Sequence, residues 1–176
     1  MTETTEQLFE SMGIKSVQVL DREQVDQVIS GQPTKILIVG SSKATREQAE
    51  DMIKKILSWN IPALDIVVNS NCKGIDMIAN EIAREIGFKV EIITQKTLGL
   101  KSNSKGEWFK NQELANNESA DMSHIAYSIA LPLGTTKQEK CSHCKKAALP
   151  YHHEKTAGCK TALRCENQTT VVLSNI

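Results

Sequence analysis

Short apolar runs rich in β-branched residues alternate with segments of helical periodicity, and this alternation is what most constrains the fold. The first run, Ile36–Val39, has no polar position and ends at Gly40, which is typical of a central parallel strand with both faces buried. From Thr45 to Trp59 the apolar residues recur at helical spacing, and Asn60-Ile61-Pro62 ends the pattern. The sequence therefore predicts a β/α unit at the start of a parallel sheet.

The same alternation continues along the rest of the chain. Further strands are expected over residues 64–68, 90–94, 124–131 and 169–173, and further helices over 75–86, 108–118 and 157–164. The polar stretch 95–106 is expected to be a long loop. These elements predict an α/β fold, an open doubly wound (Rossmann-like) parallel sheet of about five strands with helices on both faces.

The chain is expected to have one main domain and a small appendage. Residues 1–33 have two short stretches with apolar residues at helical spacing, which predict a helical appendage that ends at Gly31-Gln32-Pro33. Residues 34–176 form the Rossmann-like domain, with a cysteine-rich insert at 135–159. A domain of this size can bury a full core without disulfides or metal.

Composition excludes some classes of function. Lysine plus arginine and aspartate plus glutamate are balanced at 21 each, and the chain has only two tryptophans, two tyrosines and three phenylalanines. This argues against nucleic acid as a partner, because such proteins combine basic surfaces with aromatic stacking platforms. No apolar run approaches the ~20 residues of a membrane span, and no secretory signal is evident, so we expect no membrane association and a cytoplasmic location with reduced thiols.

Cysteine and histidine are concentrated near the end of the chain. Four of the five cysteines and three of the four histidines lie between Cys141 and Cys165. The Cys-x-x-Cys spacing of Cys141 and Cys144 is typical of a chelating pair, and one imidazole together with Cys159 could complete a tetrahedral zinc site. Four protein ligands would close the coordination sphere, so we expect structural zinc. The alternative to a zinc site is four unconnected thiols in a loop. Cys165 is expected to be a small buried apolar residue, because its position on the same helix is too far from Cys159 to share a metal.

Polar and glycine-containing loops follow the predicted strands. In an open α/β sheet, ligands bind outside the carboxyl ends of the strands, where backbone amides can approach an anionic group. The candidate ligand-binding residues in these loops are Gly40, Ser41, Ser42, Lys43, Ser70, Asn71, Lys73, Gly74, Asp76, Lys110, Asn111, Thr156 and Gly158. Together they predict a cradle for phosphate or ribose.

Two further residues near these loops have alternative interpretations. Cys72 could be a reactive thiol at a helix N-terminus, but a small packing residue is favoured. Trp108 could stack on a base, although beside Phe109 a packing anchor is favoured.

The succession of strand ends and loops resembles the SLOG superfamily of Rossmann-like domains, and within it the YspA-like branch, related to the LOG nucleotide phosphoribohydrolases and the DNA-processing protein A domain. The resemblance covers residues 35–176 and rests on segments 36–42, 66–79, 110–115 and 120–121. Its strongest piece is Lys73-Gly74-Ile75-Asp76 followed by Ala79. The family is expected to bind nucleotides or related phosphorylated molecules.

The chain also departs from the family pattern. Ser42-Lys43 stands where the family has arginine, Ser70-Asn71 replaces paired glycines, and Lys110 replaces the arginine before Asn111. Positive charge is kept, although lysine lacks the bidentate fork of arginine. The Pro-Gly-Gly-x-Gly-Thr-x-x-Glu motif of the hydrolytic LOG enzymes has no counterpart. The resemblance therefore implies nucleotide binding more strongly than hydrolysis.

The resemblance also extends to the insert. Some relatives have a Cys-x-x-Cys followed by a histidine and a Gly-Cys-x-Thr, which matches Cys141, Cys144 and the segment 153–161. This implies His153 as the imidazole ligand beside Cys159, with His143 and His152 as reserves.

Three functions are weighed on these grounds. The first is a nucleotide-binding sensor or carrier domain with structural zinc, taking a nucleotide or another phosphorylated small molecule. The alternative is an N-glycosidic hydrolase of LOG type, in which Glu113 or Asp76 would act as the catalytic carboxylate. The second alternative is single-stranded nucleic acid binding. The sheet edges and the appendage could also support a homo-oligomer.

Overall fold

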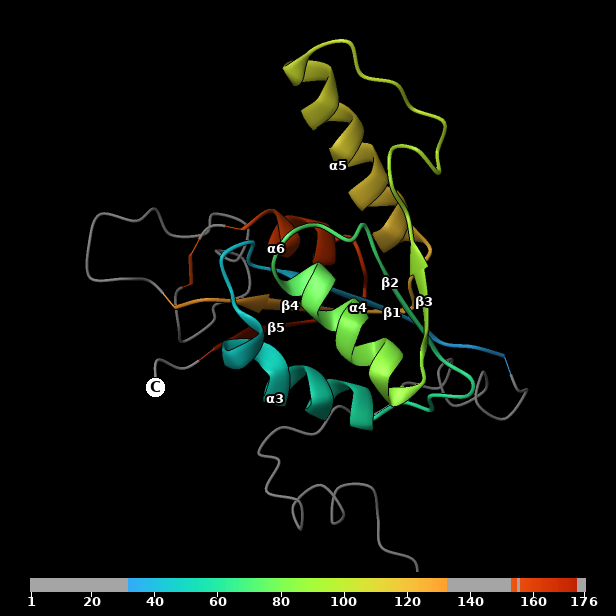
Figure 1. Ribbon diagram of the computed structural model, residues 1–176, viewed down its shortest axis with the longest axis vertical. Helices are drawn as coiled ribbons and strands as arrows, with labels where there is room; N and C mark the ends of the chain where they lie inside the picture. The colour runs from blue at the N-terminus through green and yellow to red at the C-terminus, as the bar shows by residue number, and fades with distance from the viewer. Residues whose placement is uncertain (1–31, 133–152, 155, 174–176) are drawn as a thin grey trace, which may run out of the picture. The chain divides into compact units, whose positions relative to one another are not determined.

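The computed structural model describes residues 32–132, 153–154 and 156–173 (Figure 1). The chain divides into two units, Met1–Gln32 and Pro33–Ile176. The predicted appendage up to residue 31 and the Cys-x-x-Cys pair of the insert lie outside the described residues. Within the ranges that are described, no helix is long and apolar enough to cross a membrane.

Five strands form one sheet in the order β3-β2-β1-β4-β5, and every neighbouring pair is parallel. The strands are β1 Lys35–Gly40, β2 Ile66–Asn69, β3 Lys89–Ile92, β4 Ile125–Ala130 and β5 Gln168–Val172. The helices are α3 Arg46–Ser58, α4 Ile75–Ile86, α5 Lys105–Asp121 and α6 Ala157–Ala162. The predicted Rossmann-like α/β fold is confirmed, and its strand order reverses between β1 and β4.

Helices cover both faces of the sheet, as predicted. Successive side chains of a strand point to opposite faces. Ile36 and Ile38 of β1 accordingly belong to a core that includes apolar residues of α3 and α4, whereas Leu37 and Val39 pack with Ala120 of α5 and Ala162 of α6. Because both faces are covered, the central strand β1 contains the apolar run that identified it in the sequence.

Local signals fix the two helices that flank the first loops. Thr45 and Gln48 form a capping box at the start of α3, in which each side chain accepts from the other residue's backbone amide. Gly87 ends α4 in the left-handed conformation, with φ at 113°. These boundaries agree with the sequence prediction to within one residue and place the N-terminus of α4 at the carboxyl end of β2.

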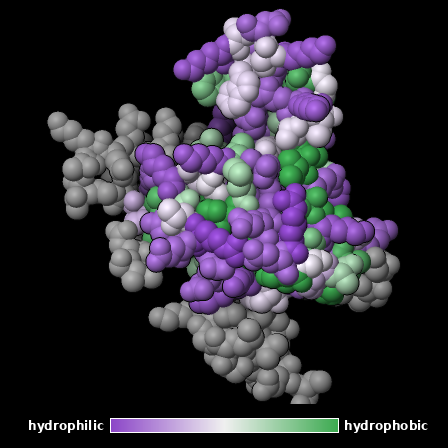
Figure 2. Space-filling view, viewed as in Figure 1, coloured by the Kyte–Doolittle hydropathy of each residue, from purple (hydrophilic) through white to green (hydrophobic). Residues whose placement is uncertain are grey.

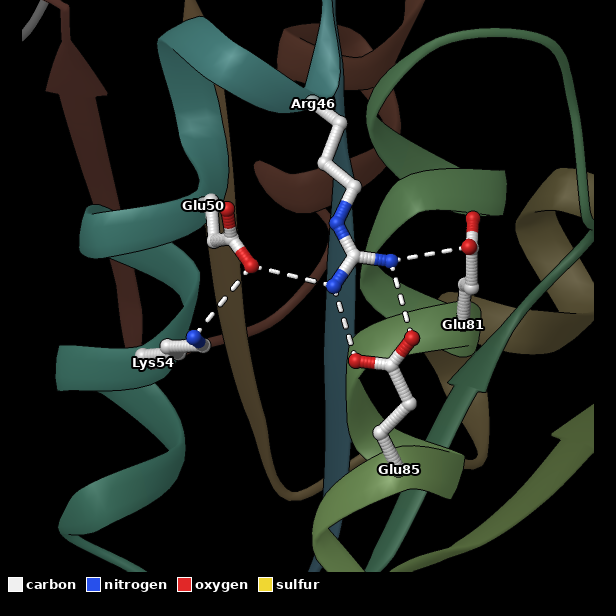
Figure 3. A network of polar contacts seen from close by, with 5 residues as sticks. All are labelled: Arg46, Glu50, Lys54, Glu81 and Glu85. Carbon is white, nitrogen blue, oxygen red and sulfur yellow. Dashed lines mark hydrogen bonds and ion pairs between the residues drawn. The ribbon is translucent and has the colours of Figure 1, made fainter.

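A cluster of charged side chains joins α3 to α4 (Figure 3). Arg46 at the start of α3 contacts Glu81 at 2.8 Å and Glu85 at 2.7 Å on α4. Arg46 also pairs with Glu50 on its own helix, and Lys54 contacts the same carboxylate. Bonds to Glu85 and Glu50 raise the pKa of the Arg46 guanidinium and lower the pKa of both carboxyls. The network therefore holds together the helices that follow β1 and β2.

Helix α5 differs from its prediction. It begins at Lys105, three residues earlier than expected, because the Ser104 hydroxyl accepts from the Glu107 amide at 3.1 Å. Its buried residues, Ala115, Ser119 and Ala120, all lie in its C-terminal half. The N-terminal half projects away from the sheet (Figure 1).

Candidate functional site

A pocket of about 230 Å³ lies at the carboxyl end of β1, beside the point where strand order reverses. Eight of the predicted ligand-binding residues line it: Gly40, Ser41, Ser42, Lys43, Lys73, Asp76, Thr156 and Gly158. Val39, Cys72, Asn116, Glu154, Ala157 and Thr161 complete the lining. The structure thus brings together loops that are far apart in the sequence, at the edge where open α/β sheets bind ligands.

Three backbone segments, those after β1 and β2 and the start of α6, are in close contact beside this pocket. A Cβ atom on Gly158 would lie 2.4 Å from Gly40 N, and one on Gly74 would lie 2.2 Å from Ser41 O. Gly74 also has φ at 94°, a conformation that favours glycine. Hydrogen bonds fix the same contacts, since Ile75 N–H donates to Ser41 O at 3.0 Å. Only glycine allows the segments after β1 and β2 and the start of α6 to come so close.

Asp76 is the titratable group whose environment is most unusual in the pocket. Its side chain is 5% exposed, and burial raises its pKa to about 7 although backbone amides donate to it. One of these is the Cys72 amide, which donates to Asp76 Oδ2 at 3.2 Å. A carboxyl with a pKa near neutrality can bind hydroxyls, or give and take a proton, at physiological pH. This was one of the two catalytic candidates from the sequence.

Cys72 does not have the properties of a reactive thiol. Burial, and then the nearby Asp76 carboxylate, raise its pKa to about 12. The thiol therefore stays protonated at physiological pH, and a thiolate is the nucleophilic form. The favoured sequence interpretation, a small packing residue, agrees with this environment.

A buried amide network shapes the loop after β2, and sequence reasoning missed it. Asn69 and Asn80 exchange side-chain hydrogen bonds at 2.9 and 2.8 Å, and Asn80 also donates to Asn71 Oδ1 at 3.0 Å. Both Asn69 and Asn80 are fully buried. An asparagine within the apolar stripe of a helix was the available signal, because such a side chain requires a partner.

Ser70 and Asn71 have structural partners instead of lining the pocket. The Ser70 and Ser119 hydroxyls lie 3.2 Å apart, and Asn71, at φ 55°, joins the amide network. Gly74 lies behind the lining, where it contacts the backbone of Ser41 and Ser42.

The residues predicted on α5 also lie outside the pocket lining. Asn111 donates to Lys101 O at 3.2 Å and to Ser102 Oγ at 3.0 Å, and Lys110 is exposed beside it. Glu113, the other catalytic candidate, is exposed and pairs with Lys160 of α6 at 2.7 Å. The Lys160 bond lowers the pKa of Glu113, so its carboxylate is a weak base on the protein surface. Asn116, about one turn beyond Glu113 on α5, lines the pocket instead.

Charge in the pocket is divided between two lysines and two carboxyls. Lys43 Nζ lies 2.8 Å from Glu154 Oε1, and the Glu154 side chain is 13% exposed whereas that of Lys43 is 69% exposed. Lys73 is exposed at the mouth, opposite in charge to Asp76. Lys43 and Lys73 could both contact an anionic ligand, and Lys43 would contact Glu154 at the same time.

Two of the four predicted zinc ligands lie in the described residues. His153 and Cys159 are 1% and 0% exposed, and His153 Nδ1 lies 2.6 Å from Glu154 O. A carbonyl only accepts, so Nδ1 bears the hydrogen and the neutral ring keeps its lone pair on Nε2, the arrangement seen in metal-bound histidines. Cys141 and Cys144 fall outside, and the ranges described hold no group of three or more candidate ligands.

No protein-family model and no curated protein matches the sequence. One solved structure that resembles it is that of DNA processing protein A from Helicobacter pylori, a protein with a single-stranded DNA binding mode. The match is 16% identical with a TM-score of 0.41, and it covers 66% of this chain and 60% of that one. The assignment to the SLOG superfamily therefore stays a prediction, and what the structure establishes is a Rossmann-like, five-stranded parallel α/β domain with a pocket at its switch point.

Proposed function

We propose that the pocket binds the phosphorylated end of a nucleotide or nucleotide derivative, and that the domain serves as a sensor or carrier of this ligand. The observation that carries the proposal is the convergence of three backbone segments at the switch point, where Gly40, Gly74 and Gly158 leave no room for a Cβ atom. Glycines that allow tight turns and close helix–strand packing are also found at the phosphate sites of α/β folds.

The side chains around the pocket support an anionic ligand. Lys43 and Lys73 offer positive charge at its mouth, and the hydroxyls of Ser41 and Thr156 lie in its lining. Asp76 is buried in the pocket lining, and its charged carboxylate could accept a hydrogen bond from a sugar hydroxyl. A phosphate joined to a ribose fits this combination of groups.

A calorimetric titration with ribose 5-phosphate and AMP tests the proposal. Lys73→Gln removes a pocket cation, and Lys89→Gln is the matched control, because Lys89 is exposed at the start of β3, at the amino end of the sheet. A charge-assisted hydrogen bond contributes about 1.5–3 kcal/mol, so we expect Lys73→Gln to weaken both ligands by roughly 10- to 100-fold. The proposal is wrong if neither compound binds, or if both lysine variants behave alike.

A second candidate function, N-glycosidic hydrolysis, is favoured by Asp76 alone. In this reaction Asp76 takes a proton from water as the water oxygen bonds to the anomeric carbon, and the bond to the base breaks as the base nitrogen takes a proton from solvent. Asp76 then returns its proton to solvent. The carboxylate is the active form, so the rate should rise as pH passes through about 7. Chromatography of AMP incubated with wild type or Asp76→Asn decides between binding and turnover. Free base that is released by wild type and not by Asp76→Asn would show turnover.

Single-stranded nucleic acid is the third candidate, and one local feature supports it. The segment 93–112 contains Lys96, Lys101, Lys105 and Lys110, all exposed, with Glu107 as its one acidic residue. This local positive charge, beside exposed aromatic rings, offsets the neutral composition that argued against nucleic acid. A mobility-shift assay at two salt concentrations tests it, because phosphate contacts weaken as salt rises.

We also propose that zinc binds Cys141, Cys144, His153 and Cys159 as a structural metal. The support is the burial of both His153 and Cys159 and the hydrogen bond from His153 Nδ1 to Glu154 O, which gives the tautomer that metal-bound histidines use. Zinc there would fix the start of α6. Native mass spectrometry should find one zinc ion per chain. Cys144→Ser should lose it, whereas Cys165→Ser should keep it, because the Cys165 thiol instead donates to Ala120 O.

A further inference from the structure

The pocket is small for a whole nucleotide. At about 230 Å³ it lies below the ~300–1,000 Å³ typical of small-molecule sites. If phosphate and ribose occupy it, as in the proposed function, the base must lie outside. The base would then need a surface next to the pocket that can receive a flat aromatic ring.

Helix α5 leads outward from the pocket along one face. Asn116 lines the pocket, and Gln112 Nε2 lies 3.1 Å from Asn116 Oδ1 and 3.4 Å from the Sγ of pocket residue Cys72. Phe109 lies three positions before Gln112 and seven before Asn116, a spacing that puts all three on the same helix face. A helix rises 1.5 Å per residue, so Phe109 stands ~4.5 Å beyond Gln112.

An exposed aromatic pair occupies this position. Phe109 is 57% exposed and Trp108 is 47% exposed, and their rings meet edge to face with centroids 5.2 Å apart. Lys105 Nζ lies 6.0 Å from the centroid of the Phe109 ring. The sequence favoured Trp108 as a packing anchor, but the structure places its ring on the surface.

The pair does not stabilise the core. None of the described residues from 105 to 114 is buried, and this half of α5 projects from the domain (Figures 1 and 2). In Figure 2 the projecting end shows hydrophilic side chains with paler ones among them. Exposed aromatic rings on such a projection are typical of a binding surface, because nothing in the described fold gains from their burial.

We infer that Phe109, with Trp108 and Lys105, forms a nucleobase subsite for a nucleotide whose phosphate occupies the pocket. This rests on the proposed function. The base stacks on the exposed part of the Phe109 ring. The edge-to-face contact with the Trp108 ring fixes the orientation of the Phe109 ring. Lys105 adds positive charge, which favours a ligand that carries phosphate.

Paired titrations with AMP and ribose 5-phosphate test the subsite, because the two ligands differ by the base. Phe109→Ala removes the ring, Phe109→Tyr keeps it, and Leu114→Ala is the control, because Leu114 is 47% exposed on the opposite side of α5. Stacking of a base on an aromatic side chain contributes ~1–3 kcal/mol, so Phe109→Ala should weaken AMP roughly 5- to 100-fold. Ribose 5-phosphate should bind this variant as it binds the wild type, and Phe109→Tyr and Leu114→Ala should keep AMP affinity.

Four other outcomes would contradict the inference, and each leads to a different conclusion. If wild type binds ribose 5-phosphate as tightly as AMP, the phosphate pocket stands and the base subsite is wrong. Equal losses of both ligands in Phe109→Ala would make Phe109 a structural residue. A change in sedimentation of Phe109→Ala without a change in base preference would make the pair a self-association surface. Failure of both ligands to bind wild type removes the proposed function, and the subsite with it.

Discussion

At the scale of single residues, Asp76 has the most unusual environment of the titratable groups that line the pocket. It is buried at the first turn of α4, where the sequence alone could not distinguish a ligand contact from a loop-ordering carboxylate. Its raised pKa arises from burial, a tertiary property that no local pattern reveals. Of the two candidate carboxyls, Asp76 is the one that lines the pocket, whereas Glu113 forms a surface ion pair with Lys160.

The raised pKa of Asp76 predicts that the stability of the folded protein depends on pH. Its pKa is raised from 3.8 to about 7 in the folded protein. Between these values the folded state holds a proton that the unfolded state has lost, so the contribution of Asp76 to stability falls as pH rises through this range. Asp76→Asn removes the cost of burying the charge. Its gain in melting temperature should be larger at pH 8 than at pH 5.

The control for this measurement is Asp51→Asn, at an exposed position of α3. We expect its melting temperature to follow that of wild type at both pH values. An Asp76→Asn curve that also parallels wild type would contradict the buried, protonatable carboxyl.

Gly158 lies at one of the close backbone contacts, and filling that contact should lower stability. In Gly158→Ala the new Cβ would meet Gly40 N at 2.4 Å, so the backbone must shift. Overpacking of this kind costs ~1–3 kcal/mol, and urea unfolding should show a loss in that range together with loss of ligand binding. In Gly106→Ala the nearest atom is 4.0 Å away, and this helical position should gain up to ~1 kcal/mol. Equal stability of the two variants would contradict the close approach.

At the scale of elements, α3 and α4 are joined through Arg46. Its side chain binds Glu81 and Glu85 across the helix pair (Figure 3). We expect Arg46→Gln to lower the melting temperature at low salt and to differ less from wild type in 1 M NaCl, because salt screens exposed charges. A difference that does not depend on salt would show that Arg46 acts through packing of its aliphatic stem.

Element boundaries were largely predictable, and the reasons are local. The apolar run of β1, the capping box of α3 and the glycine after α4 are all sequence signals that the structure confirms. The start of α5 was missed because its cap, Ser104, lies in a polar stretch that resembles a loop. The partners of Lys110 and Asn111 could not be predicted, since they depend on how far α5 projects from the sheet.

At the scale of the whole molecule, topology explains the site. With the strand order β3-β2-β1-β4-β5, the loop after β1 lies beside both the loop after β2 and the start of α6. The sequence predicted these loops as one rim, and eight of its thirteen residues line one pocket. The buried Asn69–Asn80 pair and the exposed α5 aromatics were not predicted, because long-range hydrogen bonds and exposure follow from the assembled fold.

The central claim is that the pocket beside Gly40, Gly74 and Gly158 receives the phosphorylated end of a ligand. Amide chemical shifts of the labelled protein, followed during a titration with ribose 5-phosphate, test it most directly. Ligand binding in the pocket should give saturable shifts concentrated at residues 40–43, 72–76 and 156–161. No saturable change, or shifts confined to the amino end of the sheet near Lys35, Ile66 and Lys89, would contradict it.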